Sequence, residues 1–435
     1  MTSIAEVKLW GDTIGAVTLE EGDEFASFQY DSAFAESGIE VSPLKMPLMA
    51  GQVYTFRDLK YESFYGLPGL LADSLPDKFG NALIDKWLAG QGRTPQSFNA
   101  IERLCYTGDR GMGALEYLPA EGPRRTTSHK IHIDQMVGLA SEILSKRENI
   151  NISFDDESKE QAMADMLQIG TSAGGARAKA VIAWNPATNE VRSGQVKTKE
   201  GFEYWIVKFD GVSNNRDKEL ADPEGYGVIE YAYSKMAMDA GIDMEKCELF
   251  EENNRRHFMT KRFERSSGGE KQHMQSLAAL GHYDYKMAQA HSYEQAFMVI
   301  RQLELPMSDV EQLFRRMVFN VIARNQDDHV KNIAFLMNKL GEWSLSPAFD
   351  ITYSFNPSGD WTANHQMSIN GKTDDFTLDD FKACAKTASM KRGRAEKIIN
   401  EVKQVVSHWN TYADAVGVNP SQRDGIQNAL RLNQF

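Results

Sequence analysis

The first 120 residues alternate short apolar stretches with glycine and aspartate turns. Residues 7–19 (VKLWGDTIGAVTL) and 25–31 (FASFQYD) carry this pattern, and the helix-like run 80–93 (GNALIDKWLAGQGR) follows them. Short apolar runs bounded by turn residues are typical of strands. The pattern therefore predicts a small sheet with helices, an α+β module.

The middle of the chain mixes one helix-like acidic segment with several apolar strands. The elements expected there are, in chain order, an acidic helix at 156–169, a glycine-rich turn at 170–179 (GTSAGGARAK), strands at 180–184 and 203–211 (EYWIVKFDG), a helix within 222–242 and a strand at 256–265 (RHFMTKRFER). The turn is thus flanked by strands and followed by a helix.

The last third reads as a mostly helical lobe. Apolar residues recur there at i, i+3 and i+4, which is the spacing of one helix face. The two runs are Leu313, Phe314, Met317, Val318, Val321 and Ile322, and then Ile398, Ile399, Val402, Val405 and Trp409.

A stretch rich in Gly, Pro, Ser and Thr at 121–130 (EGPRRTTSHK) marks a boundary between domains. We expect three parts, residues 1–125, 126–265 and 266–435.

Composition narrows the function classes. The chain has 435 residues, of which 42% are hydrophobic, enough for a large core. Its 48 Lys and Arg against 61 acids give a net charge of −13, which argues against an autonomous nucleic-acid binder. DNA contact would need local patches or a partner.

The cysteines and the apolar runs indicate a compartment. Cys105, Cys247 and Cys384 are far apart and form no CxxC pair, which argues against a disulfide framework and a structural zinc site. The first residues lack the basic and apolar regions of a secretion signal, and no run approaches the roughly 20 apolar residues of a membrane span. We therefore expect a cytoplasmic protein without membrane contact.

Residues 324–332 (RNQDDHVKN) crowd charged and polar groups directly after a segment that reads as a buried helix. Asp327 in such a loop could orient a hydroxyl and accept its proton, while Asn332 and Asp350 could hold Mg²⁺ against a triphosphate. The parts are those of the protein-kinase arrangement, although the letters differ from H-R-D-x-x-x-x-N and D-F-G. The alternative is that Asp327 and Asp328 are solvated loop acids and that His329 caps the helix.

The glycine-rich turn is a second candidate. Its small residues from Gly170 to Ala176 would let backbone N–H groups approach a phosphate, and Arg177 and Lys179 add positive charge. Ala176 stands where a Walker motif needs lysine, so ordinary P-loop and dinucleotide-binding patterns are excluded. By itself, a glycine-rich segment of this kind is more often a plain turn than a phosphate-binding loop.

Lys208 is the third candidate, because it lies among Trp, Ile, Val and Phe on an expected strand. It could face outward, since alternate strand residues point to opposite faces. In the functional alternative it pairs with the phosphates of ATP, and Glu230 on the following helix is the natural carboxylate to hold it.

Five ordered motifs resemble the HipA-type serine/threonine kinases, the toxins of bacterial toxin–antitoxin pairs. They are SAGGARAK (family pattern S-x-x-G-A-x-x-K), VKF, KRFER, DDHVKN (like D-G-H-x-K-N) and SPAFDI, and LWGDTIGAVTL and GLLADSLPDKFGNALI resemble the family's N-terminal domain. The resemblance implies an α+β fold with a protein-kinase-like bilobal core, an N-terminal α+β subdomain and a mostly helical C-terminal lobe.

The resemblance also implies roles for individual residues. Asp327 corresponds to the catalytic base, Asn332 and Asp350 to the Mg²⁺ ligands, and Lys208 to the phosphate-binding lysine. The ATP-binding set would further comprise Gly174, Gly175, Ala176, Arg177, Ala178, Lys179, the hinge residues Lys261, Arg262 and Phe263, and His329 and Lys331 at the phosphates. Ser172 matches the serine that family members autophosphorylate, and a phosphate there would repel ATP and switch the enzyme off.

Three positions depart from the family pattern. Asp328 replaces a glycine beside the base, where it could raise the base's pKa or bind a second cation. Arg177 stands where other members can have an uncharged residue, and Lys261 stands where the hinge strand can begin with an acid. None of these departures removes a group that the proposed chemistry requires. They bear on the affinity for the nucleotide.

The family resemblance implies a toxin that phosphorylates a translation protein, such as an aminoacyl-tRNA ligase, and is linked to persistence. Its partners would be a HipB-like helix-turn-helix antitoxin and, through it, operator DNA. Two alternatives share the core: a non-catalytic nucleotide-sensing co-repressor and a small-molecule phosphotransferase. A metal-dependent phosphohydrolase is disfavoured, because His282, His291 and His329 share no ligand spacing.

Overall fold

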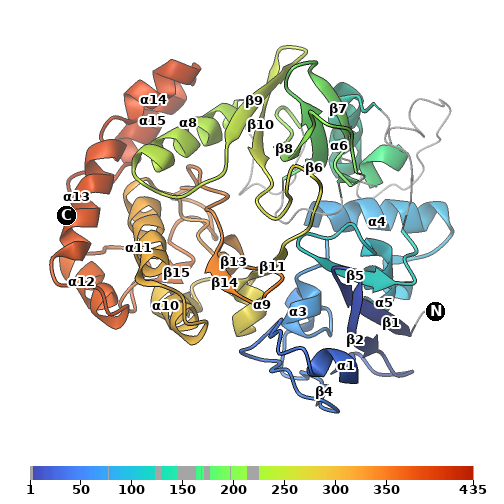
Figure 1. Cartoon of the computed structure of the whole chain (residues 1–435). Coiled ribbons are helices and arrows are strands. Elements are labelled where there is room, and N and C mark those ends of the chain that lie inside the picture. Colours follow the sequence, from blue (N-terminus) through green and yellow to red (C-terminus); the bar gives the residue numbers. More distant parts are fainter. Residues whose placement is uncertain are drawn as a thin grey trace.

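The N-terminal strands form one antiparallel sheet. The computed structural model describes residues 3–76, 78–122, 130–145, 163–167, 169–170, 177–195, 197–212 and 225–434. The sheet order is β4-β3-β2-β1-β5, with β1 Ile4–Leu9, β2 Asp12–Thr18, β3 Ser27–Tyr30, β4 Val53–Tyr54 and β5 Leu115–Leu118. The predicted small sheet is therefore present, and Figure 1 shows it near the N-terminus. Alternate residues of β1 are buried.

Short helices complete this part. They are α1 Ser32–Ala35, α2 Tyr61–Phe64, α3 Gly69–Ala72, α4 Lys78–Gly90, the 3₁₀ turn η1 Pro95–Ser97, and α5 Ala100–Thr107. The expected helix at 80–93 is confirmed as α4. Asn99 begins α5 with a capping box in which Glu102 returns the hydrogen bond.

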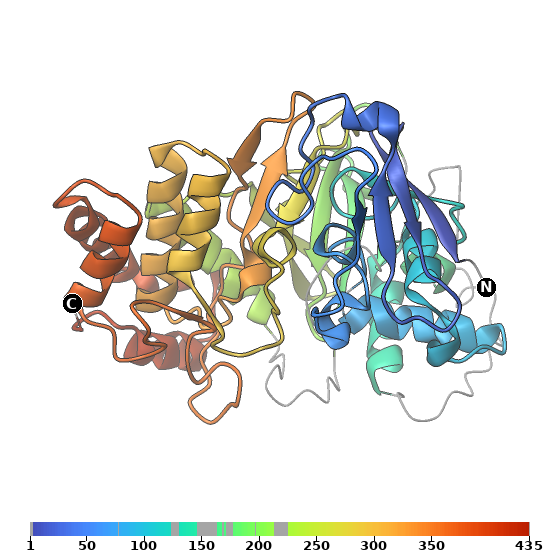
Figure 2. The ribbon, with the colours of Figure 1, turned by 90° about the horizontal axis from the view of Figure 1, so that it is seen from below.

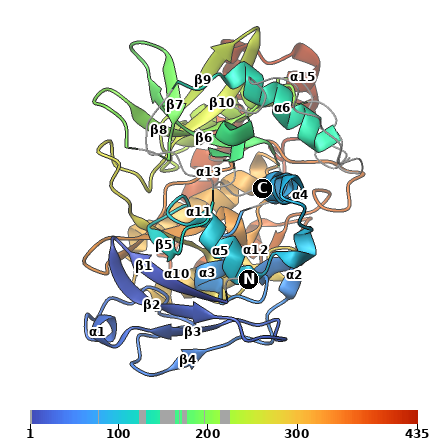
Figure 3. The same cartoon turned by 90° about the vertical axis from the view of Figure 1, so that its right-hand side faces the viewer.

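A second five-stranded sheet has the order β7-β6-β8-β10-β9. Its strands are β6 Lys179–Asn185, β7 Glu190–Ser193, β8 Glu203–Lys208, β9 Cys247–Glu252 and β10 Arg255–Lys261. One face packs on α6 Ile133–Ser145 through buried residues such as Val137, Ile182 and Trp205. Phe79 and Leu83 of α4 join this core, and Figure 3 shows α4 between the two sheets.

Helix α8, Tyr226–Asp239, lies against β9 and β10. The close approach depends on Gly227, because a Cβ there would lie 2.9 Å from the carbonyl oxygen of Arg256 and 3.1 Å from the amide nitrogen of Phe258. This contact brings Glu230, one turn further along α8, over the end of β8.

The remaining chain forms the largest core cluster around α11, Met307–Ile322. The other helices are α9 Leu277–Gly281, α10 Tyr293–Gln302, η3 Val330–Asn332, α12 Leu378–Thr387, α13 Arg394–Val406, α14 Trp409–Val416 and α15 Pro420–Ala429. All six apolar positions of the first predicted helical face are buried in α11. The second run is split, because α13 ends at Val406 and α14 starts at Trp409.

Two small sheets lie within this mostly helical part. One has the order β11-β13-β14, with β11 His273–Ser276, β13 Ala334–Met337 and β14 Trp343–Leu345, and the other pairs β12 His291–Ser292 with β15 Met367–Ser368. The N-terminal part docks here, because the Asp73 carboxylate accepts from Ser276 and Gly69 N–H donates to His282 Nε2 at 3.1 Å. Figure 2 shows the two parts side by side.

Three features of the described residues concern membrane spans, disulfides and the fold class. No helix in the described ranges is long and apolar enough to cross a membrane. All three cysteines are buried and free, and none forms a disulfide. The mixture of sheets and helices agrees with the expected α+β class.

Candidate active site

Lys208 is the centre of a buried ion network. Its Nζ lies 2.5 Å from Glu230 Oε1 and 2.5 Å from Asp350 Oδ1. Only 8% of the Lys208 side chain and 1% of the Glu230 side chain are exposed. The outward-facing alternative for Lys208 is therefore wrong, and Glu230 is the carboxylate that holds it.

The ion network shifts the pKa values of Lys208 and Asp350. Burial alone would raise the pKa of Asp350, but the positive charges of Lys208 and Lys179 outweigh it and lower that pKa to about 2. Burial would lower the pKa of Lys208, but Asp350 and Glu230 raise it. Lys208 and Asp350 are therefore both charged near neutral pH.

Two further cations converge on the same carboxylates. Lys179 of β6 is paired across the sheet with Lys208 of β8, which places both lysines next to Asp350. Arg177 Nη1 lies 3.3 Å from Glu230 Oε2, and the guanidinium stacks 4.4 Å from the ring centroid of Tyr226. Ala178 is buried between them. Ser172, Gly174, Gly175 and Ala176 lie outside the described residues.

The loop after α11 presents Asp327. Trp361 Nε1–H donates to Asp327 Oδ1 at 2.7 Å, and Asn332 Nδ2–H donates to the Asp327 backbone carbonyl at 2.8 Å. His329 Nε2 lies 3.8 Å from the same carboxylate oxygen. Asp327 is thus held in place through both its side chain and its backbone.

Asp327 has the electrostatics of a base. Burial raises its pKa, the Trp361 hydrogen bond and His329 oppose that rise, and Asp350 and Asp328 add to it. Its side chain is still 31% exposed, so a substrate hydroxyl can reach it. A carboxylate of raised pKa accepts protons more readily than a free one.

The Asp350 loop is tied to the Asp327 loop by backbone bonds. Gln326 N–H donates to the Ser354 carbonyl at 3.2 Å, and Ser354 N–H donates to the Arg324 carbonyl at 3.0 Å. Asp350 itself has a left-handed backbone with φ of 53°. Such strain in a non-glycine residue is characteristic of functional sites.

Asn332 and Asp350 fit Mg²⁺ chemically. Asn332 donates through its amide nitrogen, which leaves its oxygen to act as a ligand, and Asp350 supplies a carboxylate. Hard oxygen donors of this kind, completed by phosphates and water, are what Mg²⁺ takes. Within the described ranges no three His, Cys, Asp or Glu side chains converge on a metal site.

His329 and Lys331 lie beside this loop. His329 caps the short helix η3 that follows it, because its Nδ1 accepts from Lys331 N–H at 3.2 Å. It does not cap the buried helix before the loop, since α11 ends at Ile322 with Ala323 as its cap. The Lys331 ammonium lies 4.8 Å from the ring centroid of Tyr285. Asp328 is not the solvated acid of the alternative interpretation, because only 1% of its side chain is exposed.

Of the predicted hinge residues, Lys261 is the last residue of β10, and Arg262 and Phe263 follow it; the strand does not continue to residue 265 as predicted. Lys261 pairs with Glu203 at 2.7 Å, and the Phe263 ring packs 5.8 Å from that of Phe349. Arg262 is fully buried against Glu264, which removes its guanidinium from any nucleotide. Only the Arg262 backbone could therefore line a nucleotide.

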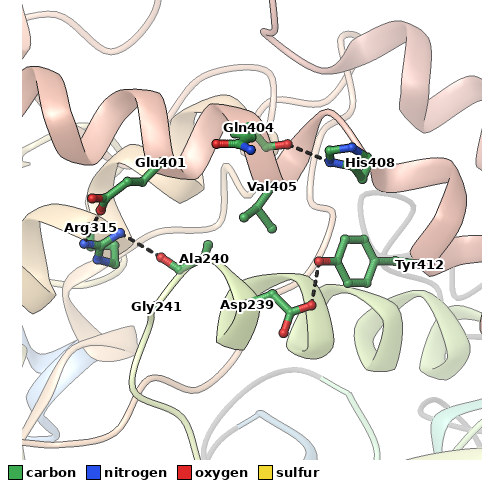
Figure 4. A pocket seen from close by; sticks show the side chains of 9 residues that line it. All are labelled: Asp239, Ala240, Gly241, Arg315, Glu401, Gln404, Val405, His408 and Tyr412. Carbon is green, nitrogen blue, oxygen red and sulfur yellow. Dashed lines mark hydrogen bonds and ion pairs between the residues drawn. The ribbon is translucent and has the colours of Figure 1, made fainter.

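A separate pocket of about 400 Å³ lies between α8, α11, α13 and α14 (Figure 4). Its polar groups bond to one another, as when Tyr412 donates to Asp239 Oδ2 at 2.6 Å and Arg315 pairs with Glu401 at 2.7 Å. None of its lining residues belongs to the Lys208 network.

Sequence reasoning missed Trp361, which bonds to the candidate base. It lies 34 positions from Asp327 in a region without regular structure. No periodic or motif signal marks it, so only the folded chain identifies it.

Comparisons with known protein families match two parts of the chain. The HipA N-terminal domain matches residues 5–118, and the HipA-like C-terminal domain matches residues 171–409. No relative was found among curated proteins.

Solved structures that are similar to the chain include the following two. HipA of Shewanella oneidensis MR-1, solved with HipB and operator DNA, is 14% identical with a TM-score of 0.68, over 99% of this chain and 96% of that one. The Helicobacter pylori proinflammatory kinase CtkA is 13% identical with a TM-score of 0.35, over 52% of this chain and 88% of that one. The first likeness supports the α+β HipA fold. Because the C-terminal domain match alone spans more than half of the chain, this protein belongs to the HipA family.

Proposed function

We propose that this protein is an ATP- and Mg²⁺-dependent serine/threonine protein kinase. The observation that carries the proposal is the Lys208 network, in which one buried lysine joins a helix carboxylate, Glu230, to a loop carboxylate, Asp350. Phosphoryl transfer needs a lysine fixed in this way next to a metal-binding aspartate and a hydroxyl-orienting aspartate. Asp327 supplies the last of these.

Each residue has a task in this reaction. Lys208, held by Glu230, contacts the phosphates of ATP and offsets their charge. Asp327, oriented by Trp361, accepts the hydrogen bond of the substrate hydroxyl and then its proton as the oxygen attacks the γ-phosphate. Lys331, in the short helix η3 four residues after Asp327, would contact the transferred phosphate.

Asn332 and Asp350 would hold Mg²⁺. The ion would offset negative charge on the phosphates of ATP. Asp350 also pairs with Lys208, so a bound metal ion would share this carboxylate with the ammonium.

The test is transfer of labelled phosphate from ATP with Mg²⁺, using phosphate-free protein. Wild type, Asp327→Asn and Asp350→Asn are compared with Asp414→Asn, a control in which an exposed acid of α14 is changed. We expect transfer in the wild type and the control, and a loss of about 10² to 10⁴-fold in the two site variants.

Each alternative function predicts a different result. ATP binding without any transfer would favour a nucleotide-sensing co-repressor. Transfer to small molecules in a filtered extract, without transfer to protein, would favour a small-molecule phosphotransferase. Either outcome would contradict the proposal.

We also propose that the kinase is the toxin of a HipA/HipB-like pair. Support comes from the family and from the Shewanella structure, which contains HipB and operator DNA. The partners would be a helix-turn-helix antitoxin, operator DNA bound through it, and a translation protein as substrate. Expression of wild type should arrest growth, Asp327→Asn should not, and coexpression of the antitoxin should restore growth.

A further inference from the structure

Asp328, the neighbour of the proposed base, is completely enclosed by hydrogen-bond donors. Tyr293 O–H donates to Oδ2 at 2.8 Å, and Gln366 N–H donates to Oδ1 at 2.8 Å. His365 Nδ1 lies 2.9 Å from Oδ2. Burial would raise the pKa of Asp328, but His365, Tyr293 and the Gln366 N–H outweigh it and lower that pKa. The buried carboxylate is therefore charged.

His365 connects this carboxylate to the segment after α15. Arg431 Nη1 lies 3.1 Å from His365 Nε2, and Arg431 also pairs with Asp374. A guanidinium can only donate, so Nε2 must accept and Nδ1–H must donate to Asp328. Arg431 N–H also donates to the Ile322 carbonyl at the end of α11, at 3.0 Å. Arg431 thus fixes the orientation of the ring that holds Asp328.

A second branch runs from Asp328 towards the proposed metal ligand. Tyr293 accepts from Asn320 Nδ2 at 3.1 Å, and Asn320 Oδ1 accepts from Asn325 Nδ2 at 2.9 Å. The same Asn325 amide donates to the backbone carbonyl of Asp350 at 3.3 Å. One buried carboxylate therefore bonds, through neighbouring side chains, to both loops of the proposed site.

The geometry points to Asp328, His365 and Arg431 as positioning residues that hold the Asp327 and Asp350 loops in register. This inference rests on the proposed kinase function. Asp328 does not serve a second cation, because three donors already surround its oxygens in a buried site. The segment after α15 thereby becomes part of the active-site scaffold.

The physical reason is the precision that transfer demands. An error of about 1 Å in a catalytic group can cost on the order of 10²-fold in rate. A loop residue gains such precision when its neighbour is locked by directional, charge-assisted hydrogen bonds. Asp327 and Asp328 are adjacent, so fixing one fixes the backbone of the other.

The test compares Asp328→Asn and Arg431→Met with Arg423→Met. Arg423 is a matched control, because it lies on α15 and pairs only on the surface with Asp414 and Asp424. We expect kcat to fall about 10 to 100-fold in the first two variants, with KM for ATP within about threefold of wild type. The control should keep both values.

A milder variant guards against loss of folding. In His365→Asn the amide nitrogen can replace Nδ1 and still donate to Asp328, while the contact with Arg431 is lost. We expect kcat between those of wild type and Asp328→Asn. Wild-type kcat in Asp328→Asn, or equal losses of kcat and ATP affinity in all three variants, would overturn the inference.

A readout independent of activity separates this inference from the proposed function. The Trp361 indole N–H, which donates to Asp327, gives an NMR resonance that can be assigned with Trp361→Phe. It should shift in Asp328→Asn and Arg431→Met and stay in place in Arg423→Met. An inactive wild type would overturn the kinase function alone, whereas an unmoved resonance would overturn the positioning role.

Discussion

The ammonium of Lys208 and the carboxylate of Asp350, 142 positions apart in the chain, form an ion pair with an Nζ–Oδ1 distance of 2.5 Å. The pair joins the sheet to the helical part of the molecule at the proposed site. Glu230 binds the same ammonium, so Lys208 connects strand β8, helix α8 and the loop that contains Asp350. We therefore expect the lysine to matter for stability and for the proposed phosphoryl transfer.

Replacing Lys208 with methionine should damage both properties. The change keeps the volume but leaves Glu230 and Asp350 close together without the shared cation. We expect phosphate transfer to fall at least about 10²-fold, and the free energy of unfolding to fall by about 3 kcal/mol, since Arg177 still pairs with Glu230. Transfer assays and urea denaturation measure the two effects.

The matched control is Lys246→Met. Lys246 lies just before β9, and its half-exposed ammonium pairs with Glu248. Its stability should change by less than about 1 kcal/mol, because surface pairs contribute little. A Lys208→Met protein as stable as this control would contradict the structural role of the network.

Asp327→Asn should strongly reduce phosphate transfer without lowering the stability of the fold. Burial raises the folded-state pKa of Asp327 above its ordinary 3.8, so the neutral form is favoured by folding. That stability is present below the unfolded pKa and is lost as pH rises through the folded pKa. The permanently neutral asparagine should therefore make the protein equally or more stable at pH 7, measured without Mg²⁺ or nucleotide.

The stability gain should vanish below the ordinary pKa, because both side chains are then neutral. Denaturation curves of wild type and Asp327→Asn at pH 7 and near pH 3.5 test this. A variant less stable than wild type at pH 7 would show that the charged carboxylate stabilises the fold, contrary to the direction of the pKa shift.

Trp361→Phe should lower kcat without changing ATP affinity. The ring can still pack, but the indole N–H that donates to Asp327 Oδ1 at 2.7 Å is lost. The base is then less well oriented, and we expect kcat to fall about tenfold. Trp343→Phe, whose indole bonds instead to the Glu40 carbonyl, is the control. Equal kcat values in the two variants would remove Trp361 from the proposed mechanism.

Ser172→Glu should weaken ATP binding. Autophosphorylation of this serine is a proposal that rests on the family motif, and the residue lies outside the described ranges. A phosphate adds roughly −1.5 to −2 charge, and glutamate imitates part of it. Calorimetry should show a higher Kd for ATP in Ser172→Glu than in Ser172→Ala. Unchanged affinity would argue against self-inactivation at this position.

The sequence predicted the helices and strands better than the contacts between them. The apolar periodicity located α11 and the strands β6 and β8, and the DDHVKN and SPAFDI motifs selected the polar residues of the site. Periodicity reports local burial and motifs report local chemistry, so both are readable from neighbouring residues. The hinge strand was predicted too long, since β10 ends at Lys261 although Arg262 and Glu264 beyond it are still buried.

The sequence by itself determined the class of fold, the family resemblance and the identity of Lys208, Asp327, Asn332 and Asp350 as candidate residues. Only the tertiary structure decided that Lys208 faces Glu230 and Asp350, that Trp361 bonds to Asp327, and that Asp328 is buried against His365. These contacts join residues far apart in the chain. Their geometry depends on how helices and loops pack in three dimensions, which no local pattern of side chains encodes.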